Sequence, residues 1–564
     1  MRQHAAVSFW LHKLEGVPEL AAFRPLIKGT PPIIAKSIAI GVIALLPVLA
    51  QPSNSLSAQR IREHVRFLAS DLLEGRGVGT RGGDLATEYI ATQFALAGAK
   101  PAGDNGSYFQ KVPLVAVEPR PETQLSATNS GQTLAFRWLD DFVGLNEEQK
   151  PESRFEAEAV FVGHGIAARE WDWDDYKGVD VRGKVVVLFT NEPTSTDLKF
   201  FDGRALTYYG RWTYKYEEAT RRGAAATIII HTTPTAGYGW DVVRSSWGRQ
   251  NTYVAVKPGE HALALAGWMT REAGEKLLAL AGKTVDELLA ASESRDFRPI
   301  PLGIRVRGDV RTNVRAVDTR NVAAVVQGSD PKLKDETIIF SAHWDHLGVG
   351  EAVNGDAIYN GAIDNATGCG ILLELARSWA ALPQKPRRSA LFLAVTAEED
   401  GLRGSEYYAA HPIVPLGKTA LALNYDAIYP WGRAQNIVIA GAERTTVWPL
   451  AQSIARRLNL AISPDSEPEQ GHYFRSDHFS FAHAGIPAFS IEHATQFAGK
   501  PADYYKRSWE EFNDKHYHQP SDEFHADWDF TALEQAAEFG MLLGIDVANQ
   551  EKLADWRAGD EFHR

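Results

Sequence analysis

The segment that decides the fold is ETIIFSAHWDHLGVG, residues 336–350, in which an apolar run leads directly into polar side chains. Residues 338–340 predict a buried β-strand, because short runs of β-branched and aromatic residues favour strands. His343, Asp345 and His346 follow at its carboxyl end. Such an ending is either hydrogen-bonded to a covering loop or part of a metal site. Partners for His343 elsewhere in the sequence decide between these two interpretations.

Similar apolar runs alternate with helical segments from residue 320 onward. The strand-like runs are NVAAVVQG, TIIFS, SALFLAV, ALALN, NIVIAG and PAFSI, and ILLELARSWAAL has helical character. This alternation predicts an α/β sheet with helices on both faces.

Two other patterns precede this region. Residues 58–97 have helical periodicity, with Ile61, Val65 and Leu68 spaced to share one helix face. Further along, VVVLF and ATIIIHT predict two strands with a helix between them. This small β/α unit interrupts the chain before the polar strand ends begin, as expected of an inserted domain.

Length and composition narrow the class of protein. A chain of 564 residues predicts two or more domains. The hydrophobic fraction of 44% and charged fraction of 23% are typical of a soluble globular protein. A formal net charge of −12, without a long Lys/Arg run, argues against a nucleic-acid partner. The single cysteine, Cys369, excludes an intrachain disulfide and a CxxC zinc site, so His, Asp and Glu would have to bind any metal.

The N-terminus predicts an export signal over residues 1–50. Residues 37–50 are uncharged and apolar, follow Lys28 and Lys36, and end in small residues that suit cleavage after Ala50. Fourteen residues are too few for a typical membrane span. We therefore expect a periplasmic or secreted protein without stable membrane insertion. An uncleaved anchor and a start codon assigned too far upstream are the alternatives.

The polar strand ends carry the residue types of a metal site. In an open α/β sheet the carboxyl ends of the strands line one edge, where ligands bind. This edge is therefore expected to receive two histidines and four acidic residues from distant parts of the sequence: His343, Asp364, Glu398, Glu399, Asp426 and His518.

This set has the size and chemistry for two cations. Zinc accepts imidazole nitrogen and carboxylate oxygen. Two ions about 3.5–4 Å apart need a bridging carboxylate and two further ligands each, which makes five residues. Of Glu398 and Glu399, only one can readily face a metal from a strand end, and the other is free to act as general base. Asp345 lies on the same side of the strand as His343 and can orient its ring.

Several motifs together carry a family resemblance. SAHWDHLG, GAIDNATG, TAEEDGLRGSEYY, NYDA, RSDHFSFAHAGIPAF and YHQPSDE resemble, in this order, those of peptidase family M28, the co-catalytic dizinc aminopeptidases and their relatives. The resemblance covers about residues 320–545, and LASDLLEGRGVGTRGGDLATEYIATQF is similar to the helical start of the same family. GVDVRGKVVVLF and YEEATRRGAAATIIIH resemble a protease-associated (PA) domain.

The resemblance implies an architecture. The expected fold is a mixed, largely parallel sheet flanked by helices, the phosphorylase/hydrolase-like zinc exopeptidase fold, with an inserted β-rich PA domain. The expected divisions are residues 51–135 for the N-terminal helical part of the peptidase domain, 136–300 for the PA domain and 301–564 for the catalytic domain.

The resemblance also implies a role for each candidate metal ligand. His343 and Asp426 would bind the first of two zinc ions, and Glu399 and His518 the second. Asp364 would bridge the two ions.

Three further expectations follow from the resemblance. Glu398 would be the general base, and Asp345 would be the partner of His343 outside the ligand set. The peptide bond between Asp364 and Asn365 is expected to be cis.

Other polar residues of these motifs have less specific interpretations. His346 is expected to be packed and hydrogen-bonded, because the ligand set is complete without it. Asp477 and His478 are expected either to contact substrate or to fix a loop, and not to bind metal. Cys369 is expected to be a small buried side chain.

The predicted function is hydrolysis of the N-terminal peptide bond of peptides by a zinc exopeptidase. Two ions would share and acidify a water, and Glu398 would take its proton and return it to the leaving amine. The nearest alternative is a PA-containing carboxypeptidase, with Arg433, Arg475 and Arg507 as candidates to bind a substrate carboxylate.

Two further alternatives are less favoured. A glutaminyl-cyclase-like transferase with a single zinc fits poorly with motifs that match the dizinc set. A non-catalytic, transferrin-receptor-like binding protein would lack the full metal set, whereas here every ligand position and the base position are filled.

Overall fold

The computed structural model describes residues 56–563. The predicted export signal, residues 1–50, lies outside these residues. Among the described residues, no helix combines the length and the apolar character needed to cross a membrane.

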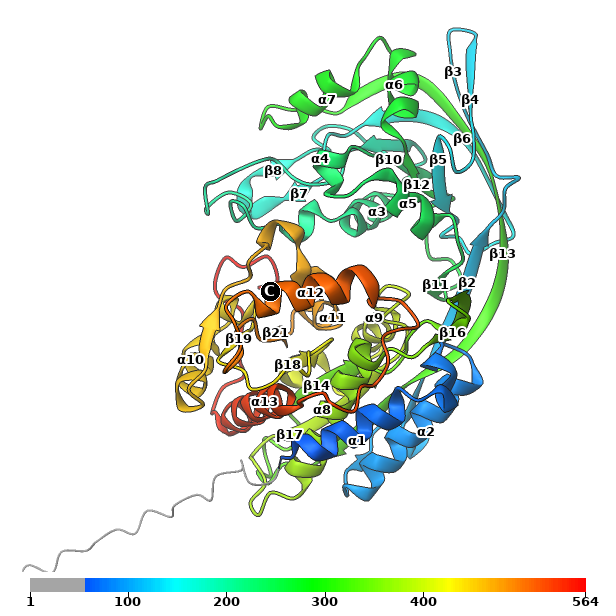
Figure 1. The fold of residues 1–564 in the computed structure, drawn as a ribbon. Coiled ribbons are helices and arrows are strands. Elements are labelled where there is room, and N and C mark those ends of the chain that lie inside the picture. Colours follow the sequence, from blue (N-terminus) through cyan, green and yellow to red (C-terminus); the bar gives the residue numbers. More distant parts are fainter. Residues whose placement is uncertain (1–55, 564) are drawn as a thin grey trace, which may run out of the picture. The chain divides into compact units, whose positions relative to one another are not determined.

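The candidate ligand residues belong to a mixed sheet with the strand order β21–β18–β14–β17–β13 (Figure 1). Strands β14 (Thr337–His343), β17 (Ser389–Val395), β18 (Thr419–Tyr425) and β21 (Ala488–Ile491) are parallel to one another, and β13 is antiparallel to β17. These four parallel strands are buried along their whole length, as expected of a parallel sheet covered on both faces. The predicted α/β fold with a mixed, largely parallel sheet is confirmed.

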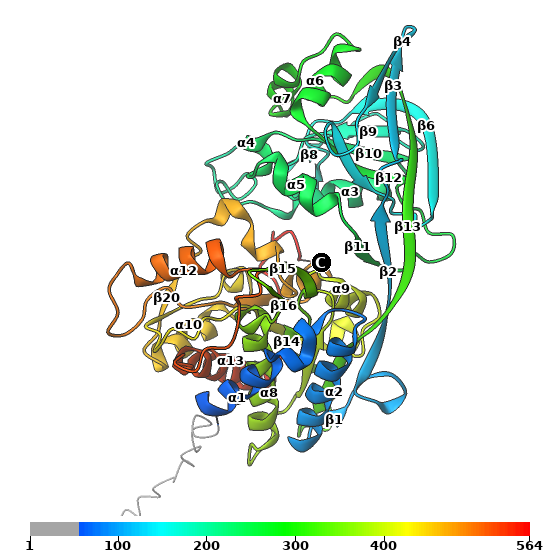
Figure 2. The same cartoon turned by 45° about the vertical axis from the view of Figure 1, so that its right-hand side comes forward.

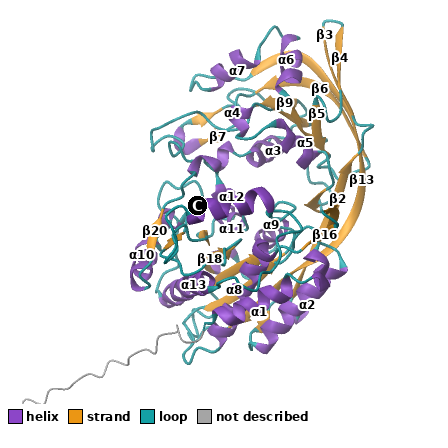
Figure 3. Ribbon diagram, in the orientation of Figure 1, coloured by secondary structure: helices purple, strands orange, loops and turns teal. Residues whose placement is uncertain are grey.

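Helices pack on both faces of this sheet (Figures 1 and 3). Helix α8 (Thr367–Ala380) packs against β14, β17 and β18, together with α1 (Ala58–Leu68) and α13 (Thr531–Asn549). Helices α9 (Arg403–Ala410) and α11 (His478–His483) pack against each other, and α11 also contacts β18 and β21. The remaining helices of this part are α2 (Arg81–Leu96), α10 (Trp448–Arg457) and α12 (Tyr504–Lys515).

Helix α1 shows why the sequence folds locally as predicted. The Ser57 side chain accepts a hydrogen bond from Arg60 N, which satisfies one of the free N–H groups at the helix start. Ile61, Val65 and Leu68 are almost completely buried against the core. The helix face predicted from their spacing is therefore the face that packs.

Strand β13 (Ile300–Val326) is 27 residues long and belongs to two parts of the structure (Figure 2). Its last residues pair with β17, its middle pairs with β2 (Phe109–Pro119), and its first half pairs with β6 (Glu152–Phe161) and β3 (Gln124–Asn129). At about 3.3 Å per residue it extends for about 90 Å. The sequence predicted only the apolar C-terminal end of β13 as a strand. In the earlier part of β13, charged and apolar residues alternate, and the charged residues are largely exposed.

A second set of parallel strands lies between residues 142 and 269. Strands β6, β9 (Val185–Leu188), β10 (Ala226–Ile230) and β12 (Leu265–Met269) are parallel, and β5 (Phe142–Leu145) is antiparallel to β12. The two predicted strands of this unit are confirmed as the neighbours β9 and β10, with the predicted helix α3 (Trp212–Arg221) between them. The other helices are α4 (Thr233–Ala236), α5 (Trp240–Trp247), α6 (Arg271–Ala279) and α7 (Val285–Ser292).

Short strands complete the described chain. Strand β11 (Asn251–Val254) pairs with β2, and β15 (Gly348–Val353) forms a hairpin with β16 (Asp356–Tyr359). The others are β1 (Lys100–Pro101), β4 (Gln132–Phe136), β7 (Ala167–Ala168), β8 (Trp173–Asp174), β19 (Asn436–Val438) and β20 (Ala461–Ser463).

A buried arginine joins the N-terminal helices to the loops around the candidate site. The Arg76 side chain, 1% exposed, donates to four main-chain carbonyls. Its Nε bonds to Trp344 O at 2.8 Å and its Nη1 to both Leu68 O and Asn360 O at 2.6 Å. Its Nη2 bonds to Gly361 O at 2.9 Å. Arg76 therefore fixes the chain just after His343 and just before Asp364.

Replacing Arg76 by Met should destabilise the protein by at least about 3 kcal/mol, because several buried carbonyls would lose their donor. Urea unfolding followed by tryptophan fluorescence measures the effect. Arg81→Met is the matched control, since the Arg81 side chain is 72% exposed, and it should stay within about 0.5 kcal/mol of wild type. Equal unfolding midpoints for Arg76→Met and wild type would contradict this role.

Candidate metal centre

The predicted ligand residues lie together at the carboxyl ends of the parallel strands. His343 is the last residue of β14, Glu399 lies in the loop after β17, and Asp426 directly follows β18. Asp364 lies in the turn that leads into α8, and its peptide bond to the next residue is cis, as predicted. His518 lies three residues beyond α12, with a positive φ of 56°.

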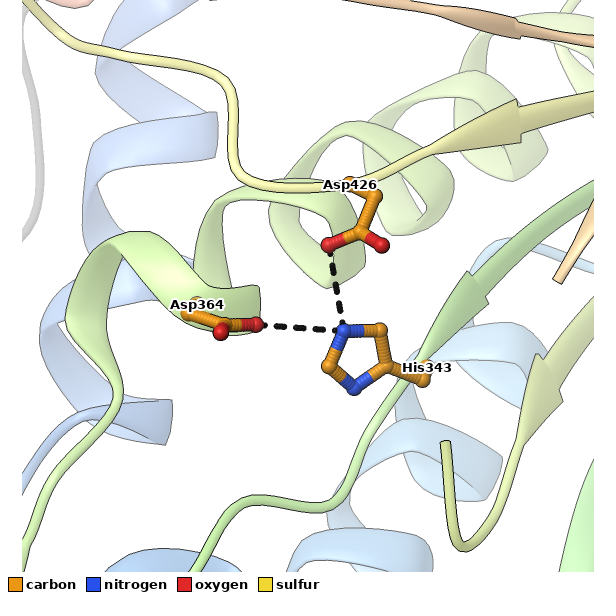
Figure 4. A group of neighbouring side chains, drawn as sticks. All are labelled: His343, Asp364 and Asp426. Atoms are coloured by element: carbon orange, nitrogen blue, oxygen red, sulfur yellow. Dashed lines mark hydrogen bonds and ion pairs between the residues drawn. The ribbon is translucent and has the colours of Figure 1, made fainter. Parts of the chain in front are cut away.

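The first group of side chains surrounds the His343 ring (Figure 4). Its Nε2 lies 3.2 Å from Asp364 Oδ1 and 3.1 Å from Asp426 Oδ1. All three side chains are at least four-fifths buried. A nitrogen and two carboxylate oxygens thus converge on one point.

The second group uses the other oxygen of Asp364. His518 Nε2 lies 3.4 Å from Asp364 Oδ2 and 3.1 Å from Glu399 Oε2. The Asp364 carboxylate therefore presents one oxygen to each histidine, as a bridging ligand would.

The donor set fits divalent cations. The groups His343–Asp364–Asp426 and His346–Asp364–Glu399 each have ligand atoms within 4.8 Å of one another. Buried polar atoms usually make a well-aligned hydrogen bond, yet His518 Nε2 and Glu399 Oε1 make none, although each has a close polar neighbour. Imidazole nitrogens and carboxylate oxygens are the ligands that zinc accepts.

Charge attraction dominates the electrostatics of these groups. Burial opposes ionisation of Asp364, but the adjacent imidazoles of His343 and His518 hold its pKa well below the usual range. Burial and the Asp364 charge both raise the pKa of Glu399, but His346 and His518 outweigh them and lower it to about 2. The carboxylates are thus held in the ionised form that binds a metal.

His346 lies closer to the second group than the sequence predicted. Its side chain is buried, as expected, but neither ring nitrogen makes the expected hydrogen bond. Instead Nδ1 lies 2.6 Å from Glu399 Oε1, and the ring meets that of His518 edge-on with 5.6 Å between centroids. His346 is therefore part of the immediate surroundings of Glu399.

Asp345 contacts His343 in a different way from the prediction. The Nδ1 of His343 is hydrogen-bonded to the main-chain oxygen of Asp345 at 3.2 Å, whereas the carboxylate Oδ1 is 3.9 Å away. That carboxylate oxygen accepts a hydrogen bond from Glu398 N at 3.3 Å. The Asp345 side chain thus connects the loop after β14 to the loop that carries Glu398.

Glu398 is placed in an environment that favours its protonated form. Burial raises its pKa well above the usual range, and the nearby charges of Asp426 and Glu399 raise it further, against the attraction of His343. Its main-chain oxygen accepts hydrogen bonds from Gly401 N and Leu402 N, which fix the turn after β17. Of the two adjacent residues, Glu398 is therefore the one that holds a proton more strongly.

Asp522 supports the bridging position and was not predicted. It is almost fully buried, and its carboxylate accepts hydrogen bonds from Ile363 N at 3.0 Å and Asp364 N at 3.1 Å. Its main-chain oxygen accepts from Ala362 N at 2.9 Å. The signal in the sequence was an acidic residue four positions after His518.

A chain of hydrogen bonds orients Asp426 and was also not predicted. Ser476 Oγ donates to Asp426 Oδ2 at 2.6 Å and accepts from Asn424 Nδ2 at 2.8 Å. Ser341 Oγ donates to Asn424 Oδ1 at 2.8 Å. Each residue lies within one of the family-like motifs, but sequence spacing cannot show which side chains face one another.

Asp477 and His478 are fully buried next to this chain. Asp477 Oδ1 accepts a hydrogen bond from Ser405 Oγ at 2.6 Å, and burial raises its pKa to about 7. The ring of His478 packs edge-on against Tyr473 at 4.7 Å. These contacts favour the loop-fixing interpretation of both residues.

Cys369 is buried as predicted, with its Sγ 3.2 Å from His343 O.

A cavity of about 500 Å³ opens beside the second group. Asp345, His346, Glu399, Asp400 and His518 form one part of its lining. The arginines that the sequence offered for binding a carboxylate, Arg433, Arg475 and Arg507, do not line it.

Residues 321–539 match the model of Peptidase family M28. This match supports a metallopeptidase of that family over the region that carries the family-like motifs. It includes all the candidate metal ligands.

Curated relatives match over shorter stretches. One is "probable leucine aminopeptidase 2" of Aspergillus oryzae, 33% identical over 111 residues, which are 20% of this chain and 20% of the relative. Another is a "Probable zinc metalloprotease" of Pyricularia oryzae, 37% identical over 94 residues, which are 16% of this chain and 18% of the relative. The chain spans about a fifth of the length of these curated relatives.

Solved structures match over more of the chain. An aminopeptidase from Aneurinibacillus sp. strain AM-1 is 21% identical, with a TM-score of 0.47. The match covers 87% of this chain and 94% of the aminopeptidase chain. A zinc aminopeptidase from Bacillus subtilis is 16% identical, with a TM-score of 0.40. The match covers 90% of this chain and 99% of the Bacillus chain.

The burial of His478 predicts a pH dependence of stability. Burial lowers its pKa from 6.5 to about 3 in the folded protein. Between these values the unfolded chain binds one more proton, so stability falls as the pH falls from 6.5 toward 3. His478→Phe should reduce this slope by about 1.4 kcal/mol per pH unit.

Urea unfolding between pH 4 and pH 6, on protein kept metal-free with chelator, measures the slope without a contribution from metal release. Exposed His525, replaced by Phe, is the control and should keep the wild-type slope. If His478→Phe also keeps it, His478 is charged in the folded protein and the account of its burial is wrong.

Proposed function

We propose that the chain is a zinc-dependent exopeptidase of family M28 that hydrolyses the N-terminal peptide bond of peptides. The observation that carries the proposal is the position of Asp364, whose two carboxylate oxygens each approach a different histidine. A single-metal site needs no such shared carboxylate.

In the proposed site, His343 and Asp426 would hold one zinc ion, Glu399 and His518 would hold the other, and Asp364 would be shared between them. When bound, the ions would lower the pKa of a water and polarise the scissile carbonyl. Buried Asp522 holds the Asp364 turn in place and half-buried Ser476 orients Asp426, as outer partners of metal ligands commonly do.

Glu398 is the proposed general base. Burial raises its pKa, and the Asp345 carboxylate fixes its main-chain N–H. It would remove a proton from the attacking water and deliver it to the leaving amine, so one residue serves both proton transfers. The pKa values of adjacent Glu398 and Glu399 are shifted in opposite directions, which supports different roles for the two residues.

The choice between aminopeptidase and carboxypeptidase rests on what binds the ends of the substrate. A relative named as an aminopeptidase matches part of this chain, which favours the first. A non-catalytic binding protein is disfavoured, because every ligand position and the base position carry a suitable side chain. We further propose that residues 136–300 form an inserted PA domain and that the protein is exported after cleavage near Ala50.

Glu398→Gln should keep the metal content of wild type and lose activity by about 10²- to 10⁴-fold, because the amide cannot accept the proton. Leucine p-nitroanilide hydrolysis measures the activity, and elemental analysis measures zinc per chain. Near wild-type turnover with verified zinc would contradict the role of Glu398.

A substrate panel separates the two exopeptidase classes. An aminopeptidase should cleave leucine p-nitroanilide and free peptides, lose that activity with chelator, and regain it with zinc. N-acetylated peptides should be poor substrates, because the free amine would be missing. Rapid release of the last residue from N-acetylated peptides would instead establish a carboxypeptidase.

A further inference from the structure

The lining of the cavity beside the metal centre also has a positively charged part. Besides Glu399 and His518, it includes Arg249, Gln250 and Arg315. Its volume of about 500 Å³ lies within the range of small-molecule binding sites. Two arginines therefore share one cavity with two of the candidate zinc ligands.

The positions of these arginines are set by the sheet. Thr252 of β11 and Arg315 of β13 are both paired with Ala116 of β2, on its two sides. Residues directly opposite in neighbouring strands point to the same face, so Arg315 and Thr252 share a face, about 10 Å apart across three strands. Arg249 lies three residues before Thr252, and Gln250 accepts a hydrogen bond from Arg315 Nε at 3.4 Å.

This charged part of the lining is connected to the loop that carries the proposed base. Arg403, the first residue of α9 after the Glu398 turn, donates from Nε to Thr252 O at 2.9 Å and lies over the Tyr253 ring at 4.7 Å. Strand β11 is therefore held in place relative to Glu398 and Asp400.

The two arginines lack internal partners for their charge. Both are exposed to solvent, and within residues 56–563 no carboxylate oxygen lies within 4.0 Å of either guanidinium, although many other arginines of the chain are so paired. Burial raises the pKa of Asp400, and the charge of Arg249 is a minor contribution against this rise, without an ion pair between the two side chains. Glu351 also lines the cavity, on the exposed hairpin strand β15. Its negative charge partly offsets the positive charge of the two arginines.

We propose that Arg249 and Arg315 bind a carboxylate on the leaving-group part of the substrate. This rests on the proposed function and makes its substrate class more specific: short peptides that place a carboxylate within one or two residues of the scissile bond. Arginine binds carboxylates with fixed geometry, and an unpaired guanidinium keeps its full capacity for this. The carboxylate is either the free C-terminus of a dipeptide or tripeptide, or an acidic side chain.

Four substrates test the proposal: Leu-Gly, Leu-Gly-amide, Leu-Asp-amide and Leu-Asn-amide. If the arginines bind the C-terminus, wild type should have a kcat/KM at least 10-fold higher for Leu-Gly than for Leu-Gly-amide. If they bind an acidic side chain, the same difference should appear between Leu-Asp-amide and Leu-Asn-amide. Arg249→Ala combined with Arg315→Ala should remove this preference, mainly through KM. Arg307→Ala is the matched control, since Arg307 is an exposed residue of β13 outside the cavity.

Leucine p-nitroanilide carries no carboxylate, so its hydrolysis tests the proposed peptidase activity separately from the proposed carboxylate site. The arginine variants should hydrolyse it within about threefold of wild type. No hydrolysis by zinc-loaded wild type would overturn the proposed function. Titration calorimetry with Leu-Gly and its amide on Glu398→Gln would then still measure the carboxylate preference. Equal affinity or equal kcat/KM for the acid and the amide in both pairs would overturn the carboxylate site.

Discussion

The structure depends on how several carboxylates can be buried side by side. Asp364, Glu399 and Asp426 are at least four-fifths buried at one edge of the sheet, and Asp345 and Glu398 are further acidic residues of the same loops. Buried charges are costly unless they are paired or coordinate a metal. Within the described chain, the partners that face the first three are the imidazoles of His343, His346 and His518. A cluster with this excess of negative charge is suited to hold cations.

The surrounding fold keeps these charges in position. Arg76 fixes the loop after His343 and the turn before Asp364, through main-chain carbonyls and not through an ion pair. Asp522 fixes the Asp364 turn from the other side, and Ser476 orients Asp426. Strand β13 extends from the sheet that carries the candidate ligands into the preceding β-rich part of the chain. The two arginines of the cavity are therefore held at a set place relative to the candidate metal ligands.

The sequence predicted much of this because the relevant signals are local. The apolar runs identified the parallel strands, and the rule that ligands lie at strand ends predicted that the two histidines and the acidic residues would meet at one edge. The resemblance assigned the individual roles, including that of Asp364 as the bridging ligand, which strand periodicity alone could not. The contacts of Arg76, Asp522 and Ser476 were missed because each joins segments far apart in sequence, with no local pattern. His346 was judged dispensable from a count of ligands, whereas its distance from Glu399 depends on a loop path that the sequence does not encode locally.

Diffraction from crystals grown with zinc, recorded on both sides of the zinc absorption edge, shows whether Asp364 bridges two zinc ions. We expect two anomalous peaks on either side of the Asp364 carboxylate. One should lie about 2.0–2.2 Å from His343 Nε2 and Asp426, and the other at that distance from His518 Nε2 and Glu399. A single peak at full occupancy, or two peaks that do not share Asp364, would contradict the bridging role.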